Sequence, residues 1–144
     1  MAQLTFPIIQ PGLVVHVMVN LEVSVLLPLR SSGGGPSPVP GRALIDTGSD
    51  ISAVALPILQ QLGIPVLRPT LTQGIGGPVQ VNLYEVSRPI LDAQNVSLPW
   101  LSQLSLVVME LAPGVPFDAR IGLDVIRTCK WLVDGPADLC TVDF

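Results

Sequence analysis

The sequence predicts an all-β fold, and three features support this prediction. Fifteen of the 144 residues are proline, about twice the usual share of about 5%, and proline interrupts long helices. Short runs rich in Val, Leu and Ile are interleaved with polar residues, as in half-buried strands. Segments rich in glycine and proline separate these runs. We therefore expect short strands, shaped loops and one or two short helices.

The first strands are expected over 13–20 and 21–29, as paired or continuous strands. The segment 31–41, SSGGGPSPVPG, is expected to be a flexible surface loop. We interpret it as an insertion within one domain, because the strands on its two sides are too few to fold separately. A short apolar strand follows over 42–45.

The middle of the chain predicts one helix and one hairpin. A short helix is expected over 57–62, since a proline lies in its first turn and a glycine follows its end. The segments 66–73 and 79–88 flank Gly74-Ile75-Gly76-Gly77. Two strand-like runs around such a glycine-rich tip predict a β-hairpin.

The last part of the chain predicts three further elements. One strand is expected over 104–111 and a shorter one over 119–122, after which Asp124 is expected to cap a brief helix. The segments 130–133 and 139–144 are expected to form a terminal hairpin.

Length and composition limit the possible functions. A chain of 144 residues is expected to form a single domain over 1–144. Only 12% of its residues are charged, about half the typical share, so we expect an apolar groove, an oligomer interface or both. The net charge of −4 argues against nucleic acid as a partner. No membrane-spanning run or signal segment is visible, so a soluble, cytoplasmic protein is expected.

Cysteine and histidine are too few for several kinds of site. Cys129 and Cys140 do not make a disulfide framework and are expected to be buried small side chains. The one histidine, His16, is expected to be a strand residue. A zinc site or a Ser-His or Cys-His pair therefore lacks partners, and we expect no metal and no cofactor.

The candidate catalytic residue follows the strand at 42–45. In the sequence Ala-Leu-Ile-Asp-Thr-Gly-Ser-Asp over 43–50, an apolar strand delivers Asp46 into a turn that glycine can make tight. An Asp after three apolar residues is costly unless its charge is used or satisfied. An Asp-Thr-Gly triplet occurs by chance in roughly a few per cent of chains of this length, so its context matters.

In that context the sequence resembles the retropepsins, the retroviral-type aspartic peptidases, and their cellular relatives. Residues 46–49 match the catalytic signature, and 74–77 resemble the glycine-rich flap that closes over a bound peptide. Residues 120–126 resemble the hydrophobic-Gly segment and helix that support the catalytic loop. Residues 2–6 and 139–144 resemble the terminal strands. The resemblance implies a closed acid-protease-like β-barrel that works as a two-fold homodimer, with chain ends interleaved between subunits.

The resemblance also implies roles for the residues of the loop. Asp46 would be the catalytic carboxylate, Thr47 would hydrogen-bond across the two-fold axis, and Gly48 would let backbone and substrate approach closely. Ser49 would hydrogen-bond the outer oxygen of Asp46. Asp50 would accept hydrogen bonds from the substrate backbone, or it would cap its own turn.

Two other segments receive roles in the same way. Gly74, Ile75, Gly76 and Gly77 would form the flap tip and bind substrate; taken alone, they would also suit an ordinary hairpin turn. Ile121 and Gly122 would support the catalytic loop. Leu123 stands where retroviral enzymes often have an arginine that pairs with the residue equivalent to Asp50.

The chemistry requires a second copy of the chain. Peptide hydrolysis by this route needs two carboxylates that share a proton, and the sequence holds no second Asp-Thr-Gly or Asp-Ser-Gly. A homodimer would complete the pair and would cleave extended, largely apolar peptides. The alternative is a non-catalytic peptide-binding or dimerisation module, against which the intact Asp-Thr-Gly-Ser argues.

Overall fold

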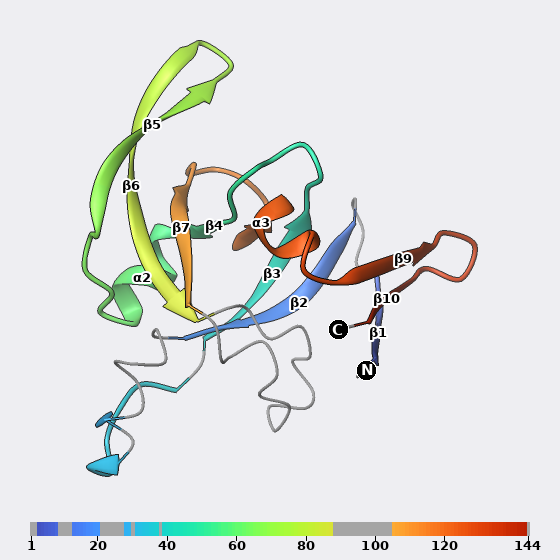
Figure 1. The fold of residues 1–144 in the computed structure, drawn as a ribbon, viewed down its shortest axis with the longest axis horizontal. Coiled ribbons are helices and arrows are strands. Elements are labelled where there is room, and N and C mark those ends of the chain that lie inside the picture. Colours follow the sequence, from blue (N-terminus) through green and yellow to red (C-terminus); the bar gives the residue numbers. More distant parts are fainter. Residues whose placement is uncertain are drawn as a thin grey trace.

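The fold is described by a computed structural model, in which residues 3–8, 13–20, 28–29, 31–37, 39–87 and 105–143 are placed. Most of the chain in these ranges is β-structure, with two short helices (Figure 1). The elements, in chain order, are β1 (Gln3–Pro7), β2 (Val14–Val19), β3 (Val39–Ile45), β4 (Ala53–Ala55), α2 (Leu56–Gln61), β5 (Arg68–Gly74), β6 (Gly77–Ser87), β7 (Ser105–Leu111), β8 (Ala119–Ile121), α3 (Leu123–Ile126), β9 (Lys130–Asp134) and β10 (Leu139–Asp143).

Seven of these strands form one sheet, in the order β2-β3-β8-β4-β7-β6-β5. The sheet is open, because β2 and β5 stand at its two edges and do not pair with each other. The predicted closed barrel is therefore wrong. Barrel closure depends on strand tilt and stagger across the whole sheet, which no local sequence pattern specifies.

The two ends of the chain form a second, three-stranded sheet in the order β1-β10-β9. β1 pairs antiparallel with β10 of the same chain, from Gln3 opposite Asp143 to Pro7 opposite Leu139. The interleaving of chain ends between two subunits stays a prediction, and within this one chain the two ends pair with each other. Both edges of β10 are occupied by strands of its own chain.

Most predicted elements lie where the sequence placed them. The hairpin of β5 and β6, the strand β7, the short strand β8 and the terminal hairpin of β9 and β10 are confirmed. β2 confirms the strand at 13–20 and includes His16. The strand predicted over 21–29 falls largely outside the described residues.

The predicted loop at 31–41 extends too far. Val39, Pro40 and Gly41 belong to β3, where they pair with Val19, Met18 and Val17 of β2. β8 pairs only with the later part of β3, from Ala43 onward. A proline is tolerated here because this end of β3 lacks a strand neighbour on its other side.

The helices are short, and the sequence signals for them were only partly interpreted correctly. α2 has proline in its first turn and is followed by Gly63 at φ +67°, as expected. The prediction that Asp124 caps the second helix is wrong, because Gly122 is the N-cap and Asp124 lies within α3. No helix in the described ranges is long and apolar enough to cross a membrane.

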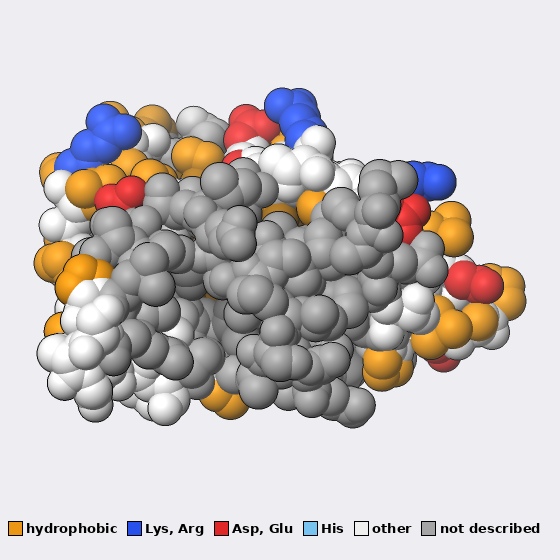
Figure 2. Space-filling model, turned by 60° about the horizontal axis from the view of Figure 1, so that its bottom comes forward, with side chains coloured by type: hydrophobic (Ala, Val, Ile, Leu, Met, Phe, Trp, Pro, Cys, Tyr) orange, Lys and Arg blue, Asp and Glu red, His pale blue; other side chains and the backbone are white. Residues whose placement is uncertain are grey.

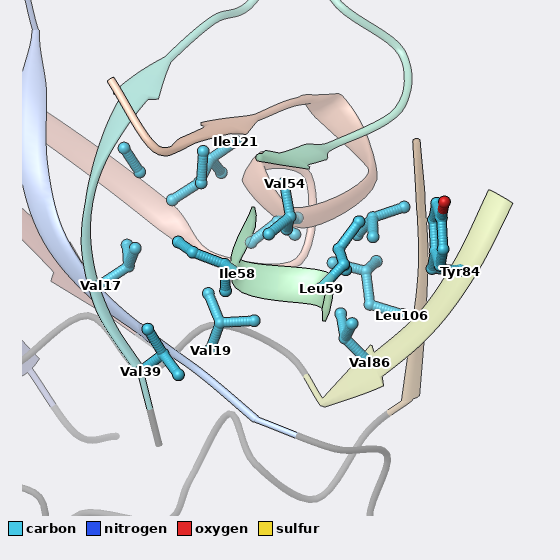
Figure 3. Close-up of a cluster of buried hydrophobic side chains, with 14 of the residues drawn as sticks. Val17, Val19, Val39, Val54, Ile58, Leu59, Tyr84, Val86, Leu106 and Ile121 are labelled. Atoms are coloured by element: carbon cyan, nitrogen blue, oxygen red, sulfur yellow. The ribbon is translucent and has the colours of Figure 1, made fainter. Parts of the chain in front are cut away.

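The main hydrophobic core lies on one face of the large sheet (Figure 3). Ile58 and Leu59 of α2 lie between the valines of β2 and β3 and the side chains of β6 and β7 (Figure 3). Cys140 and Val142 of β10 belong to the same cluster, so the core links the two sheets. A smaller cluster occupies the opposite face of the large sheet and consists of Ala53, Leu83, Met109 and Leu111, with Val81 and Phe117 packed against them.

Candidate active site

Asp46 lies directly after β3, in a loop fixed by backbone hydrogen bonds. Its N–H donates to the carbonyl of Ile121 at 2.9 Å, which continues the pairing of β3 with β8. Asp46 as a residue is half-buried, and its Oδ1 accepts the N–H of Gly48 at 2.9 Å in an exposed hydrogen bond. A Cβ atom at residue 48 would lie 3.2 Å from this Oδ1. Glycine therefore lets the backbone approach the carboxylate and hold one of its oxygens.

The loop is joined to the junction between β8 and α3, which comes from a distant part of the sequence. β8 lies between β3 and β4 in the sheet, parallel to β3 and antiparallel to β4. The N–H of Leu123 donates to the carbonyl of Ser49 at 2.8 Å, and the N–H of Asp124 donates to that of Asp50 at 3.2 Å. The loop that carries the carboxylate thus rests on the first turn of α3.

Gly122 lies where two backbone segments meet most closely. A Cβ atom there would lie 2.7 Å from the carbonyl oxygen of Ser49, and 3.0 and 3.1 Å from the carbonyl carbon and oxygen of Ile51. All three neighbours are backbone atoms, which cannot rotate away as a side chain can. The close approach therefore requires glycine at this position.

A buried pair, Ser52 and Asp124, completes the support and was missed by the sequence analysis. The Ser52 hydroxyl donates to Asp124 Oδ1 at 2.7 Å, and the Ser52 N–H donates to Oδ2 at 2.8 Å. Ser52 Oγ also accepts the N–H of Gly122 at 3.0 Å. Ser52 is only 3% exposed, so each polar atom needs such a partner. A serine between apolar residues, and an Asp inside an apolar helix, were the signals available.

The remaining residues of the loop have other contacts than expected. The Ser49 hydroxyl donates to the carbonyl of Ile51 at 2.9 Å, so the predicted hydrogen bond from Ser49 to Asp46 is not formed. Asp50 is exposed, and within the described part of the chain no hydrogen bond reaches its carboxylate. Thr47 and Gly48 are also exposed. The side chains of this loop therefore remain available to ligands or to another chain.

The predicted flap is the hairpin of β5 and β6, whose tip and the Asp46 loop both lie at the top of Figure 1. Gly74 pairs with Gly77 at the tip, so Ile75 and Gly76 form the turn. Gly77 has φ +115°, a conformation that glycine adopts readily. The Ile75 side chain is fully exposed.

The described residues offer no obvious metal site. Among them, no three side chains of His, Cys, Asp or Glu gather closely enough to hold an ion. Cys129 is half-buried and Cys140 fully buried, and both are free thiols. Burial raises the pKa of the Cys140 thiol, which lowers the thiolate fraction and its reactivity.

Comparisons with known proteins identify the fold. No protein-family model matches the chain, and no curated protein matches it in sequence. Among solved structures, a retropepsin-like aspartic protease from Rickettsia conorii is similar, with a TM-score of 0.57 and 10% sequence identity. The similarity covers 99% of this chain and 91% of that one. The chain therefore has the fold of a retropepsin-like aspartic protease.

Proposed function

We propose that the protein is an aspartic endopeptidase in which two copies of the chain each contribute Asp46 to a single active site. The observation that carries this proposal is the support of Asp46: the loop is held by Ile121, Leu123 and Asp124 through their backbone groups. Its carboxylate is fixed at one oxygen by Gly48. Such fixed placement of a reacting group is what catalysis requires, whereas an ordinary surface turn does not need it.

The reaction would use one proton shared by the two Asp46 carboxylates. The ionised carboxylate would take a proton from a water molecule, whose oxygen attacks the carbon of the scissile carbonyl. The protonated carboxylate would donate to the carbonyl oxygen. The resulting tetrahedral diol would collapse as the C–N bond breaks and the nitrogen takes a proton. Since the pair must hold one proton, activity is expected to be highest at mildly acidic pH.

A second copy of the chain would also cover surface that is unusually apolar. Leu132, Val133 and Leu139 of the β9–β10 hairpin are 61%, 48% and 37% exposed. Figure 2 shows hydrophobic side chains beside acidic ones at this end of the molecule. Exposed apolar side chains close together favour association. The exposed Thr47 and Gly48 leave the Asp46 loop open to a partner loop.

The β5–β6 hairpin would act as the flap of the proposed enzyme. Its tip reaches the side of the molecule that carries the Asp46 loop (Figure 1). The backbone N–H groups of Ile75 and Gly76 are in the turn, where the residues pair only at Gly74 and Gly77. These groups would donate hydrogen bonds to an extended peptide lying between flap and loop.

Replacing Asp46 by Asn tests the proposal. The variant should lose peptide cleavage, measured with a diverse peptide library from acidic to neutral pH, and should keep the circular dichroism of the parent. Asp138→Asn is a matched control. Asp138 lies in the exposed β9–β10 turn with φ 52°, a conformation that Asn tolerates well. If Asp46→Asn cleaves as well as the parent, the assignment is wrong; if the parent binds peptides but cleaves none, a peptide-binding module is favoured.

Mixing the two forms tests whether the dyad is shared. When parent and Asp46→Asn subunits are exchanged in equal amounts, only about one quarter of the dimers hold two Asp46 residues. Activity per parent subunit should therefore fall by about half. Unchanged activity per parent subunit would show that one chain suffices for catalysis.

A further inference from the structure

Arg120 lies in the middle of the sheet face opposite the main core. On β8 its neighbours Ala119 and Ile121 belong to the main core, so Arg120 points to the other face, since side chains alternate along a strand. Arg120 is directly paired with Leu44 of β3 and with Ala53 of β4. Directly paired residues point to the same face. Arg120 therefore shares a face with Leu44 and with the smaller cluster, to which Ala53 belongs.

Asp46 belongs to this face as well. Along β3, Gly41 and Ala43 are buried, whereas Arg42 and Leu44 are half-buried. Asp46 follows Leu44 at the same two-residue spacing and so continues the half-buried set of Arg42 and Leu44. Its N–H still donates to the carbonyl of Ile121 in β8. Two residues of strand span about 7 Å and neighbouring strands lie about 4.8 Å apart, so the backbones of Asp46 and Arg120 are about 8 Å apart. An arginine side chain is long enough to reach a ligand beside Asp46.

The charge of Arg120 is not matched within the described structure. Its Nε is buried and has no hydrogen-bond partner, and none of the described carboxylates lies within 4.0 Å of its guanidinium. A guanidinium cannot lose its proton, and a partly buried cation without a partner costs free energy. The Nε of Arg42 is likewise buried without a partner, but its Nη2 donates to the carbonyl of Pro116 at 3.0 Å, whereas no such hydrogen bond holds the end of the Arg120 side chain within the described residues.

We infer that Arg120 is a specificity-determining residue that binds the carboxylate of an acidic residue in the substrate. This inference rests on the proposed peptidase function. A carboxylate can accept two parallel hydrogen bonds from a guanidinium. Arg120 is half-buried and only its Nε is buried without a partner, so the two Nη groups at the end of the side chain are the donors that such a pair would use. The apolar neighbours Leu44 and Ala53 would exclude water and strengthen the pair. The substrate is then an apolar segment with one acidic side chain near the cleaved bond.

The geometry limits where the acidic residue would lie. An extended peptide rises about 3.3 Å per residue, and Arg120 is about 8 Å from Asp46. The acidic side chain is therefore expected within about two residues of the scissile bond. In a two-fold dimer the second copy of Arg120 would serve the other side of the bond in the same way.

The experiment compares peptides that differ only in one carboxylate. From a peptide that the parent protein cleaves, a matched set is made with Glu or Gln at each position within three residues of the cut, all with amidated C-termini. A Gln peptide with a free C-terminal carboxylate tests the other possible source of the anion. A charge-assisted pair of this kind should raise kcat/KM for Glu over Gln by about 10- to 100-fold at one position. Preference for the free C-terminus alone would overturn the assignment to a side chain.

The pH dependence of the ratio of kcat/KM for the Glu peptide to that for the Gln peptide tests the inference without any protein variant. As the pH falls through the range near 4 in which Glu becomes neutral, the Glu peptide should lose its advantage over the Gln peptide. The enzyme's own pH profile cancels from the ratio, because both peptides are measured under the same conditions. A ratio near one at all pH values would overturn the inference.

Variants of Arg120 identify the cation responsible. Arg120→Gln should bring the ratio close to one, and Arg120→Lys should keep part of the preference, since it retains the charge without the two-donor geometry. Arg127→Gln removes one positive charge at an exposed position after α3 and should leave the ratio unchanged. If Arg120→Gln keeps the full preference, another group binds the carboxylate and the inference is wrong.

Binding measurements separate this inference from the proposed function. The same labelled peptides are titrated by fluorescence anisotropy into Asp46→Ala protein, with and without the Arg120→Gln change. Tighter binding of the Glu peptide that depends on Arg120 supports the inference even if the parent cleaves nothing. Cleavage with equal rates and equal binding for Glu and Gln would support the proposed peptidase function and overturn the role of Arg120.

Discussion

Replacing Gly122 by alanine should disturb both stability and activity, because the added methyl group has no room. The new Cβ would lie 2.7 Å from the carbonyl oxygen of Ser49, where ordinary contacts are 3.4 Å or longer. The Asp46 loop must therefore retreat by roughly 0.5–1 Å, against the close packing of the interior. The 2.8 Å hydrogen bond from Leu123 to Ser49 would be stretched by this movement.

The expected cost follows from these two effects. Overpacking a close contact costs about 1–3 kcal/mol, and a weakened backbone hydrogen bond adds about 1 kcal/mol. The free energy of unfolding should fall by about 2–4 kcal/mol. A shift of this size at a catalytic group should also reduce kcat/KM by roughly 100-fold.

Urea unfolding followed by circular dichroism measures the loss of stability, and the rate of peptide cleavage measures the fall in kcat/KM. Gly135→Ala is the matched control, since a Cβ at Gly135 meets nothing within 4 Å. That substitution should be neutral or slightly stabilising. If Gly122→Ala were as stable and as active as Gly135→Ala, the close approach of the two backbone segments would be refuted.

Two further predictions concern buried polar groups. Ser52→Ala removes a hydrogen bond to Asp124 and leaves the N–H of Gly122 without its partner, so the free energy of unfolding measured by urea titration should fall by about 3 kcal/mol. Ser37 is exposed, and a loss as small as that of the control Ser37→Ala would contradict this expectation. Burial and the nearby Glu110 carboxylate raise the pKa of Tyr84, because both favour the protonated phenol in the folded protein. The stability that the protonated phenol contributes is therefore complete below a pH of about 10 and is lost as the pH rises through the raised pKa of the folded state. Tyr84 is the only tyrosine, so its ultraviolet absorbance titration should have a higher midpoint in folded than in urea-unfolded protein, and equal midpoints would refute the assignment.

Local elements could be predicted from the sequence because their signals are local. The glycines at the β5–β6 tip specify a turn with a conformation that other residues avoid. The apolar run before Asp46 specifies a strand that ends at a carboxylate. Proline and Gly63 bracket α2 within one residue of the predicted bounds. In each case the residues that determine the structure are neighbours in the chain.

The errors concern contacts between distant segments. Ser52 and Asp124 are 72 residues apart in the sequence, and neither has a motif that announces the other. Asp124 looked like a helix cap because a capping residue and a residue that binds another loop are both short and polar. The pairing of β1 with β10 depends on how the whole chain folds back. The open sheet is likewise a property of all seven strands together.

The position of β8 between β3 and β4 has a consequence for biosynthesis. During translation Asp46 leaves the ribosome long before the strand that must lie beside it, and domains complete their folding only when their late segments are available. Until β8 and α3 have been made, the carbonyl groups of Ser49 and Asp50 lack the N–H groups that hold them. A nascent or truncated chain would therefore carry the acidic residue without its rigid support. The order of the strands thus delays assembly of the site until β8 and α3 have been made.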